Sequence, residues 1–184
     1  MISFYKPQSS NNGTACSFYM NSNGDFFSEL LKQKTWDSKR KIGTFNKETK
    51  VSVKWSQLEL AEMLNLLEGK QPKFSAFHKS QKQVVKVLFA KSDKYDGAYS
   101  LSVTREASDD STNQQKYFLG VYANEATLLR EHLKYLLQES FRVNDAKFSR
   151  NDEPSSSFGK KETLSKADTA YGSKVQEEDD DMEW

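Results

Sequence analysis

Hydrophobic and polar residues alternate along several short segments of the chain. The segment "VSVKW" sets Val51, Val53 and Trp55 against Ser52 and Lys54, and "AYSLSVTRE" alternates in the same way. The segments "KQVVKVLFAK" and "QKYFLGVYA" are rich in the β-branched and aromatic residues that strands favour. Together with the turn signals between them, these patterns predict strands near residues 2–6, 14–21, 26–36, 41–54, 73–78, 82–91, 98–106 and 115–123.

Two segments repeat their hydrophobic residues with helical spacing. In "SQLELAEMLNLLEGK", Ser56 and Glu59 have the spacing of a capping box, and Gly69 is a natural stop. The hydrophobic stripe of this helix consists of Leu60, Met63, Leu64 and Leu67. A second helix is expected after Asn124, with a stripe of Leu129, Leu133, Leu136, Leu137 and Phe141.

The order of these elements is four strands and a helix, written twice. Only residues 26–36 are ambiguous, because Phe26, Phe27, Leu30 and Leu31 fit a helical stripe at least as well as a strand. The internal repeat favours a strand there, since the first half otherwise lacks its third strand. We therefore expect an α+β fold of two ββββα repeats, with antiparallel sheets and two helices packed on one side.

The last part of the chain has a different composition. From Val143 onward the hydrophobic periodicity ends, and Ser, Lys, Glu, Asp and Gly dominate. Such a segment buries too little apolar surface to offset the entropy lost on ordering. The sequence predicts a domain at residues 1–142 and a disordered tail at residues 143–184.

Charge divides the chain at the same place, and several functional classes are excluded. The net charge of +1 combines a basic body with an acidic tail, an asymmetry found in proteins that bind polyanions. With Cys16 alone and two histidines, neither an intrachain disulfide nor a Cys/His zinc site can form. We find no catalytic motif and expect neither an enzyme nor a cofactor. Without a secretion signal or a long apolar run, a cytoplasmic location is expected, with no membrane partner.

The segment from Lys32 to Lys54 contains eight basic and only two acidic residues. Lys32, Lys34 and Trp36 alternate, so that on a regular strand all three point to one face. Lysines beside a flat ring form a surface on which a nucleic-acid base can stack while ammonium groups contact phosphates. The same pattern is equally compatible with an exposed edge strand, in which the lysines prevent aggregation and Trp36 folds back over the core.

A second candidate cluster is "KFSAFHKSQKQVVK", where Phe77, His78, Lys82 and Lys86 offer rings and cations. A phenylalanine lies more often in the core than on a binding surface. For His78, the sequence offers no Ser or Cys nucleophile that the imidazole could activate. Tyr99 and Arg105 on the next strand are further candidates.

The chain ends in "EEDDDMEW". Acidic residues improve solubility, but this does not explain a terminal tryptophan. The indole ring and the free carboxylate of the last residue stand at the end of an acidic, flexible segment. Such an end is suited to insertion into an apolar pocket of a partner protein that is surrounded by basic residues. The acids also resemble a phosphate backbone and can compete for the protein's own basic surface. The candidate partner-binding residues are Asp179, Asp180, Asp181, Met182, Glu183 and Trp184.

This ending resembles the carboxyl-terminal tips of bacterial and phage single-stranded DNA-binding proteins, which recruit replication and repair enzymes. The body resembles the Whirly and positive-cofactor-four type of domain. The segments "FFSELLKQKTWDSKRKIGTF", "VKWSQLELAEMLNLLE", "FSAFHKSQ", "YSLSVTR" and "LLREHLKYLL" are similar to phage-encoded Whirly-like proteins over most of residues 1–142. The "KGKAAL"-like strand of plant Whirly proteins is absent.

The resemblance implies a sheet that faces nucleic acid and a homo-oligomer formed through the helices. It would place on that sheet Lys32, Gln33, Lys34, Trp36, Lys41, Phe45 and Lys54. The sequence thus predicts a sequence-independent single-stranded DNA-binding protein of replication, recombination or repair, in the host cytoplasm if phage-encoded. Two alternatives stay open: a transcription regulator or RNA-binding module on the same fold, and a protein-interaction adaptor.

Overall fold

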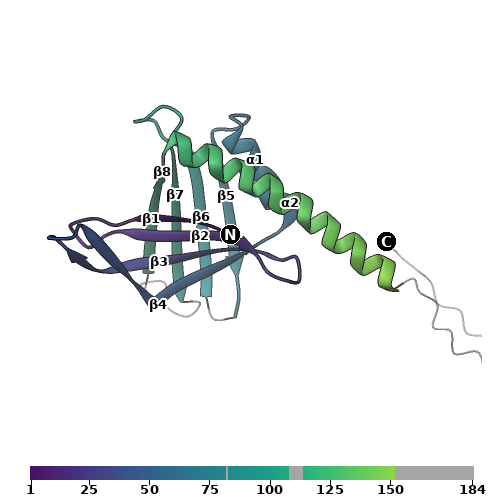
Figure 1. Cartoon of the computed structure of the whole chain (residues 1–184), viewed down its shortest axis with the longest axis horizontal. Helices are drawn as coiled ribbons and strands as arrows, with labels where there is room; N and C mark the ends of the chain where they lie inside the picture. The colour runs from purple at the N-terminus through teal and green to yellow at the C-terminus, as the bar shows by residue number, and fades with distance from the viewer. Residues whose placement is uncertain (82, 108–113, 152–184) are drawn as a thin grey trace, which may run out of the picture. The chain divides into compact units, whose positions relative to one another are not determined.

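The computed structural model describes residues 1–81, 83–107 and 114–151, with side chains to residue 146. These residues form two four-stranded antiparallel sheets, each followed by one helix, so the ββββα order is confirmed (Figure 1). Sheet A contains β1 (Ile2–Lys6), β2 (Thr14–Met20), β3 (Phe26–Asp37) and β4 (Ile42–Trp55), followed by α1 (Gln57–Leu67). Sheet B contains β5 (Lys73–Lys79), β6 (Gln83–Lys91), β7 (Tyr99–Ala107) and β8 (Gln114–Val121), followed by α2 (Ala123–Asn151).

Both sheets are meanders in which strands that are adjacent in sequence pair with each other. The ambiguous segment is the strand β3, as the repeat predicted. Its Phe26 pairs with Trp55 of β4, and its Leu30 pairs with Val51. The register therefore places these hydrophobic side chains together on one face of sheet A.

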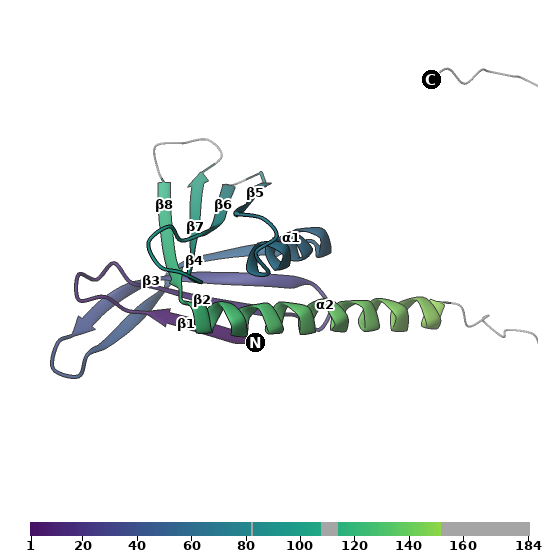
Figure 2. The same ribbon diagram turned by 90° about the horizontal axis from the view of Figure 1, so that it is seen from above.

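The hydrophobic core lies between the sheets, whose strands cross at a large angle (Figures 1 and 2). Period-two alternation turns one set of side chains inward, and that set is buried in residues 51–55 of β4 and in most of β6, β7 and β8. The indole N–H of Trp55 is satisfied inside this core, because it donates to Ser28 Oγ at 3.1 Å.

Helix α1 closes one side of the core and begins with the predicted capping box. The backbone N–H of Glu59 donates to Ser56 Oγ at 3.2 Å, and the Glu59 carboxylate accepts from the backbone N–H of Ser56 at 2.8 Å. Its buried residues are Leu60, Met63, Leu64, Leu66 and Leu67.

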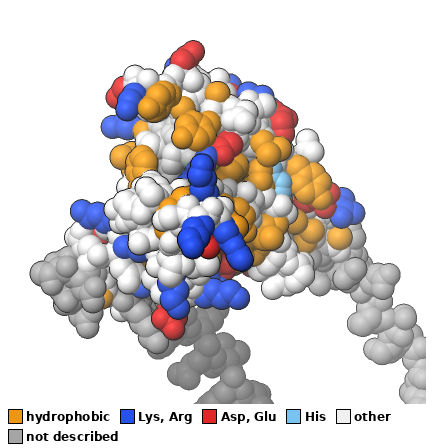
Figure 3. Space-filling model, turned by 60° about the vertical axis from the view of Figure 1, so that its left-hand side comes forward, with side chains coloured by type: hydrophobic (Ala, Val, Ile, Leu, Met, Phe, Trp, Pro, Cys, Tyr) orange, Lys and Arg blue, Asp and Glu red, His pale blue; other side chains and the backbone are white. Residues whose placement is uncertain are grey.

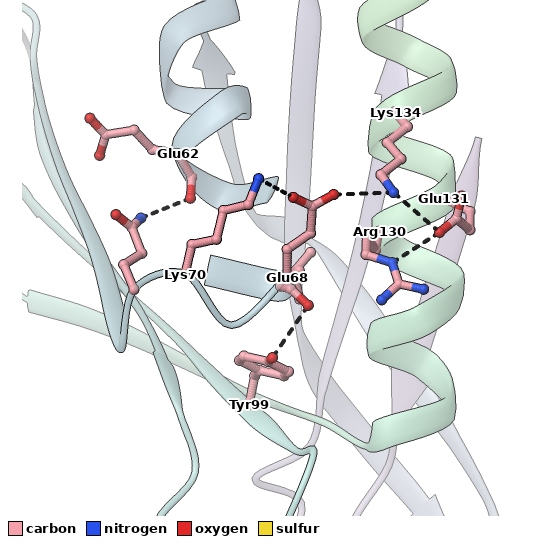
Figure 4. A network of polar contacts seen from close by, with 9 residues as sticks. Glu62, Glu68, Lys70, Tyr99, Arg130, Glu131 and Lys134 are labelled. Atoms are coloured by element: carbon pink, nitrogen blue, oxygen red, sulfur yellow. Dashed lines mark hydrogen bonds and ion pairs between the residues drawn. The ribbon is translucent and has the colours of Figure 1, made fainter. Parts of the chain in front are cut away.

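Helix α2 packs against α1 and continues to Asn151, beyond the domain boundary expected at residue 142. Gln57 of α1 donates to Ser140 Oγ of α2 at 3.0 Å. Glu68 bridges Lys70 at 2.7 Å and Lys134 at 3.1 Å (Figure 4), and these hydrogen bonds lower the pKa of its carboxyl group. The expected tail from residue 152 onward lies outside the described residues. No helix among the described residues is long and apolar enough to span a membrane.

Candidate nucleic-acid interface

The outer face of sheet B, opposite the core, exposes hydrophobic side chains beside lysines. Phe77 of β5 is 61% exposed and Phe118 of β8 is 59% exposed, although both lie within strands. Leu88 of β6 lies between them in the sheet and is 45% exposed. Exposed large hydrophobic residues that cluster on one face are unusual, and they indicate a surface that contacts a ligand.

The strand register arranges this face in rows, and we call the two central rows the sheet-B platform. Directly paired side chains in an antiparallel sheet lie about 5 Å apart. Phe77 and Phe118 are on the two edge strands, which are separated by about 14 Å across the sheet. One row consists of Phe77, Lys86, Thr104 and Lys116, and the next of Ser75, Leu88, Ser102 and Phe118.

The charge on this face is positive. Lys86 is held by Glu106, with its Nζ 2.9 Å from Oε1 and 3.0 Å from Oε2. Glu106 is the only acidic residue among the described outward-facing residues of the four strands. The other lysines on this face are Lys73, Lys79 and Lys116, and none of them forms an ion pair with a described residue. No acidic group of the described residues therefore competes with a phosphate for these three ammonium groups.

The basic segment of β3 and β4 forms a hairpin. The prediction that Lys32, Lys34 and Trp36 share one face of β3 is wrong. Gln33 pairs with Phe45 and Thr35 pairs with Thr44, so Lys34 is an extra residue in a β-bulge. A bulge reverses the alternation, and it therefore turns Lys32 and Trp36 to opposite faces of the strand. Trp36 is partly exposed in this hairpin.

Lys32 and Arg105 lie where the two sheets meet. The ammonium group of Lys32 is 5.5 Å from the ring centroid of Tyr117, a core residue of β8. Arg105 donates to the backbone carbonyl of Lys50 at 3.2 Å and to Gln115 Oε1 at 2.7 Å. Both cations therefore have contacts that hold sheet A to sheet B.

Two of the predicted site residues are buried, which corrects the surface position expected for them. Gln33 accepts from the backbone N–H groups of Gln8 and Gly13, at 2.7 and 3.1 Å, and donates to the carbonyl of Gln8 at 2.9 Å. It therefore supports the loop between β1 and β2. Tyr99 is an inward residue of β7, and its hydroxyl lies 3.4 Å from the carbonyl of Leu66 in α1.

His78 is separated from Phe77 because successive strand residues point to opposite faces. Its ring packs edge-on against Trp55 with centroids 5.4 Å apart, and its Nε2 is 3.2 Å from Glu59 Oε1. That distance suits an ion pair when the ring is protonated, but the geometry is not that of a hydrogen bond. His78 therefore faces α1 and not the platform.

The remaining predicted residues lie on other surfaces or outside the description. Lys41 is exposed in the β3–β4 turn, and Phe45 packs against Tyr5 with ring centroids 5.8 Å apart. Lys54 is on the outer face of sheet A, in an ion pair with Asp25 at 2.7 Å. Lys82 and the tail residues Asp179, Asp180, Asp181, Met182, Glu183 and Trp184 lie outside the described residues.

Of the predicted residues, the structure brings Phe77 and Lys86 together on the platform. Sequence reasoning missed Phe118, Lys116 and Leu88. A signal for two of them was present, because Lys116 and Phe118 alternate with the buried residues of β8. Figure 3 shows a face on which hydrophobic side chains lie among Lys and Arg side chains. Within the described residues, no group of three or more His, Cys, Asp or Glu side chains is placed to hold a metal ion.

Comparisons with known proteins identify the fold. No protein-family model and no curated protein matches the sequence. Three similar solved structures are the MRP1/MRP2 proteins of Trypanosoma brucei, a guide-RNA-binding protein complex bound to a guide RNA, and WHY3 of Arabidopsis thaliana. Their TM-scores are 0.60, 0.57 and 0.58, at 14%, 15% and 10% sequence identity. The alignments cover 76%, 74% and 82% of this chain, and 84%, 88% and 94% of the other chains. The chain therefore has a Whirly-like fold.

Proposed function

We propose that this protein binds single-stranded DNA, without sequence preference, across the platform of sheet B. The observation that carries the proposal is the exposure of Phe77 and Phe118 beside lysines of which only Lys86 has an acidic partner among the described residues. Each ring can stack on any base, because every base has a flat π-face. The lysines then neutralise phosphates and release counterions, which makes binding strong at low salt.

The solved structures with this fold support a nucleic-acid ligand. One of them is a complex with a guide RNA, and another is the plant transcriptional regulator PBF-2, with a TM-score of 0.58 and 11% identity. The platform supports a nucleic-acid ligand independently of those proteins, because its aromatic rings and lysines belong to this chain.

The cellular role that we propose is protection of single strands during replication, recombination or repair, with a phage as the source. In this role the acidic end of the tail recruits other proteins through Trp184 and competes with DNA for the lysines.

A homo-oligomer is part of the proposal. Leu128 and Tyr135 of α2 are both more than half exposed and lie two helical turns apart on one face.

RNA is the second candidate ligand, because β7 places three hydroxyl groups on the outer face of sheet B. Ser100, Ser102 and Thr104 are outward-facing and partly exposed. A hydroxyl can donate to or accept from a ribose 2′-OH, which DNA lacks. Competition between oligo-dT and oligo-U of equal length separates the two ligands.

The deciding experiment is a fluorescence-anisotropy titration of labelled oligo-dT with the full chain at several salt concentrations. The variant carries Phe77→Ala and Phe118→Ala, and the control carries Phe141→Ala, which removes a ring that is half exposed on α2. We expect the double variant to bind at least about 25-fold more weakly, since each stacked ring contributes about 1–3 kcal/mol. The control should bind like the unmodified protein. Equal affinities for all three proteins would refute the proposed surface.

A further inference from the structure

A hollow of about 320 Å³ lies at the β8 end of the outer face of sheet B. Besides the buried Tyr99, three exposed aromatic residues line it, and each comes from a different part of the chain. Tyr95 belongs to the β6–β7 loop, Phe118 belongs to β8, and Tyr122 is the residue between β8 and α2. They are between 54% and 59% exposed, so a large part of each residue is accessible to a ligand.

Part of the lining of the hollow consists of residues with a small side chain or none. Gly120 pairs with Ser100 across β7 and β8, and both line the hollow. Gly120 occupies an outward position between the buried Leu119 and Val121. A Cβ placed on Gly120 would meet no atom within 4 Å, so the absence of a side chain leaves this space open.

Two lysines stand over rings of the hollow. The ammonium group of Lys6 is 4.2 Å from the ring centroid of Tyr122, and that of Lys94 is 5.1 Å from the ring centroid of Tyr95. Glu125 fixes the first arrangement, because one carboxylate oxygen pairs with Lys6 and the other accepts from the backbone N–H of Tyr122 at 2.8 Å. Cations therefore lie beside an aromatic-lined space.

We propose that this hollow binds one unpaired nucleic-acid base, turned out of the strand that crosses the sheet-B platform. Phe118 belongs to both the platform and the hollow, so a strand crossing toward β8 reaches the hollow directly. The rings contact the two faces of the base, and Lys94 contacts a phosphate beside it. The volume is at the small end for a ligand pocket, which suits a single base. This inference rests on the proposed function, because it adds a subsite to the same surface.

The test narrows the hollow by Gly120→Val. The φ angle of Gly120 is not positive, and valine favours strands, so the fold should tolerate the change. The matched control is Ser52→Val, which adds the same branched side chain at an exposed position of β4 on sheet A. The probe is an oligo-dT strand with 2-aminopurine at one position, because the fluorescence of this base responds to stacking.

With the unmodified protein we expect a change in 2-aminopurine emission on binding at one or two positions of the base in the strand. Gly120→Val should abolish that change and weaken binding about 5- to 150-fold, the effect of one lost stacked base. Tyr95→Ala, which leaves the strand unaltered, should also abolish it. Ser52→Val should leave both readouts unchanged.

The two proposals fail in different ways. If the unmodified protein binds oligo-dT and Phe77→Ala alone, whose ring lies outside the hollow, weakens binding, the platform stands. If Gly120→Val and Tyr95→Ala then keep the 2-aminopurine signal and the affinity, the base subsite is refuted alone. If the unmodified protein binds no oligonucleotide at low salt, the platform and the subsite are both refuted.

Discussion

Replacing Gln33 by Met separates a structural role for this residue from contact with nucleic acid. The buried Oε1 accepts from the backbone N–H groups of Gln8 and Gly13, and the side-chain amide donates to the carbonyls of Gln8 and Thr35. Methionine matches the length of the side chain but provides none of these bonds. Neighbouring backbone groups are close, since a Cβ on Gly13 would lie 2.1 Å from Gln33 Oε1. No space is therefore available for a large rearrangement.

The expected cost follows from the groups that lose a partner. A buried N–H without an acceptor costs about 1–3 kcal/mol, and the Gly13 N–H is such a group. The N–H of Gln8 lies in an exposed residue and regains water, so its cost is small. We expect Gln33→Met to lower the free energy of unfolding by about 2–4 kcal/mol. The urea midpoint of unfolding measures this loss.

The control for this experiment is Lys34→Met, the exposed neighbour in the bulge, which should change the midpoint little. At a temperature where both variants are folded, Gln33→Met should bind oligo-dT with unchanged affinity. A midpoint equal to that of the unmodified protein, combined with a loss of affinity, would show that Gln33 contacts the ligand, and our reading of its hydrogen bonds would be wrong.

Three further predictions concern charge. Lys116→Met should reduce the slope of log affinity against log salt by about 0.7, the value for one phosphate contact on a single strand, whereas Lys54→Met on sheet A should leave the slope unchanged in the same titration. Burial lowers the pKa of His132 from its usual value near 6.5, so the folded protein binds the proton less well than the unfolded chain and loses stability as the pH falls below that value. Thermal unfolding between pH 5 and 8 should show this loss, and His132→Gln should remove it; an identical pH dependence in both proteins would contradict the assignment. Removing residues 153–184 should tighten binding of oligo-dT at low salt if the acidic tail competes for the lysines, and unchanged affinity would leave the tail only its recruiting role.

The order of the elements could be predicted because it depends on local patterns. The alternation in β4 and the capping box at Ser56 and Glu59 act within a few residues, and both are present in the structure. The position of Gln33 could not be predicted, because its partners come from a loop about twenty residues earlier in the chain. A polar residue in a basic strand resembles a surface residue until the loop that it supports is known.

The alternating pattern also did not determine which face of β8 points toward the core. The segment "QKYFLGV" has two alternating sets, and each contains an aromatic residue. Tyr117, Leu119 and Val121 are buried, so Lys116, Phe118 and Gly120 are turned outward. The stronger hydrophobic set decides the face, and this implies that Phe118 must be exposed. The same argument places Phe77 outside, since Phe74 and the partly buried Ala76 take the inward positions of β5.

The position of Trp36 has a consequence for how binding is observed. The β3–β4 hairpin that carries Trp36 belongs to sheet A and the platform belongs to sheet B, so they are different surfaces of one domain. Trp36 can therefore report only on the hairpin. If nucleic acid occupies the platform alone, saturating oligo-dT should leave the Trp36 contribution to the emission unchanged, which comparison with Trp36→Phe measures. Quenching of Trp36 together with loss of affinity in Phe77→Ala would show that one strand contacts both surfaces.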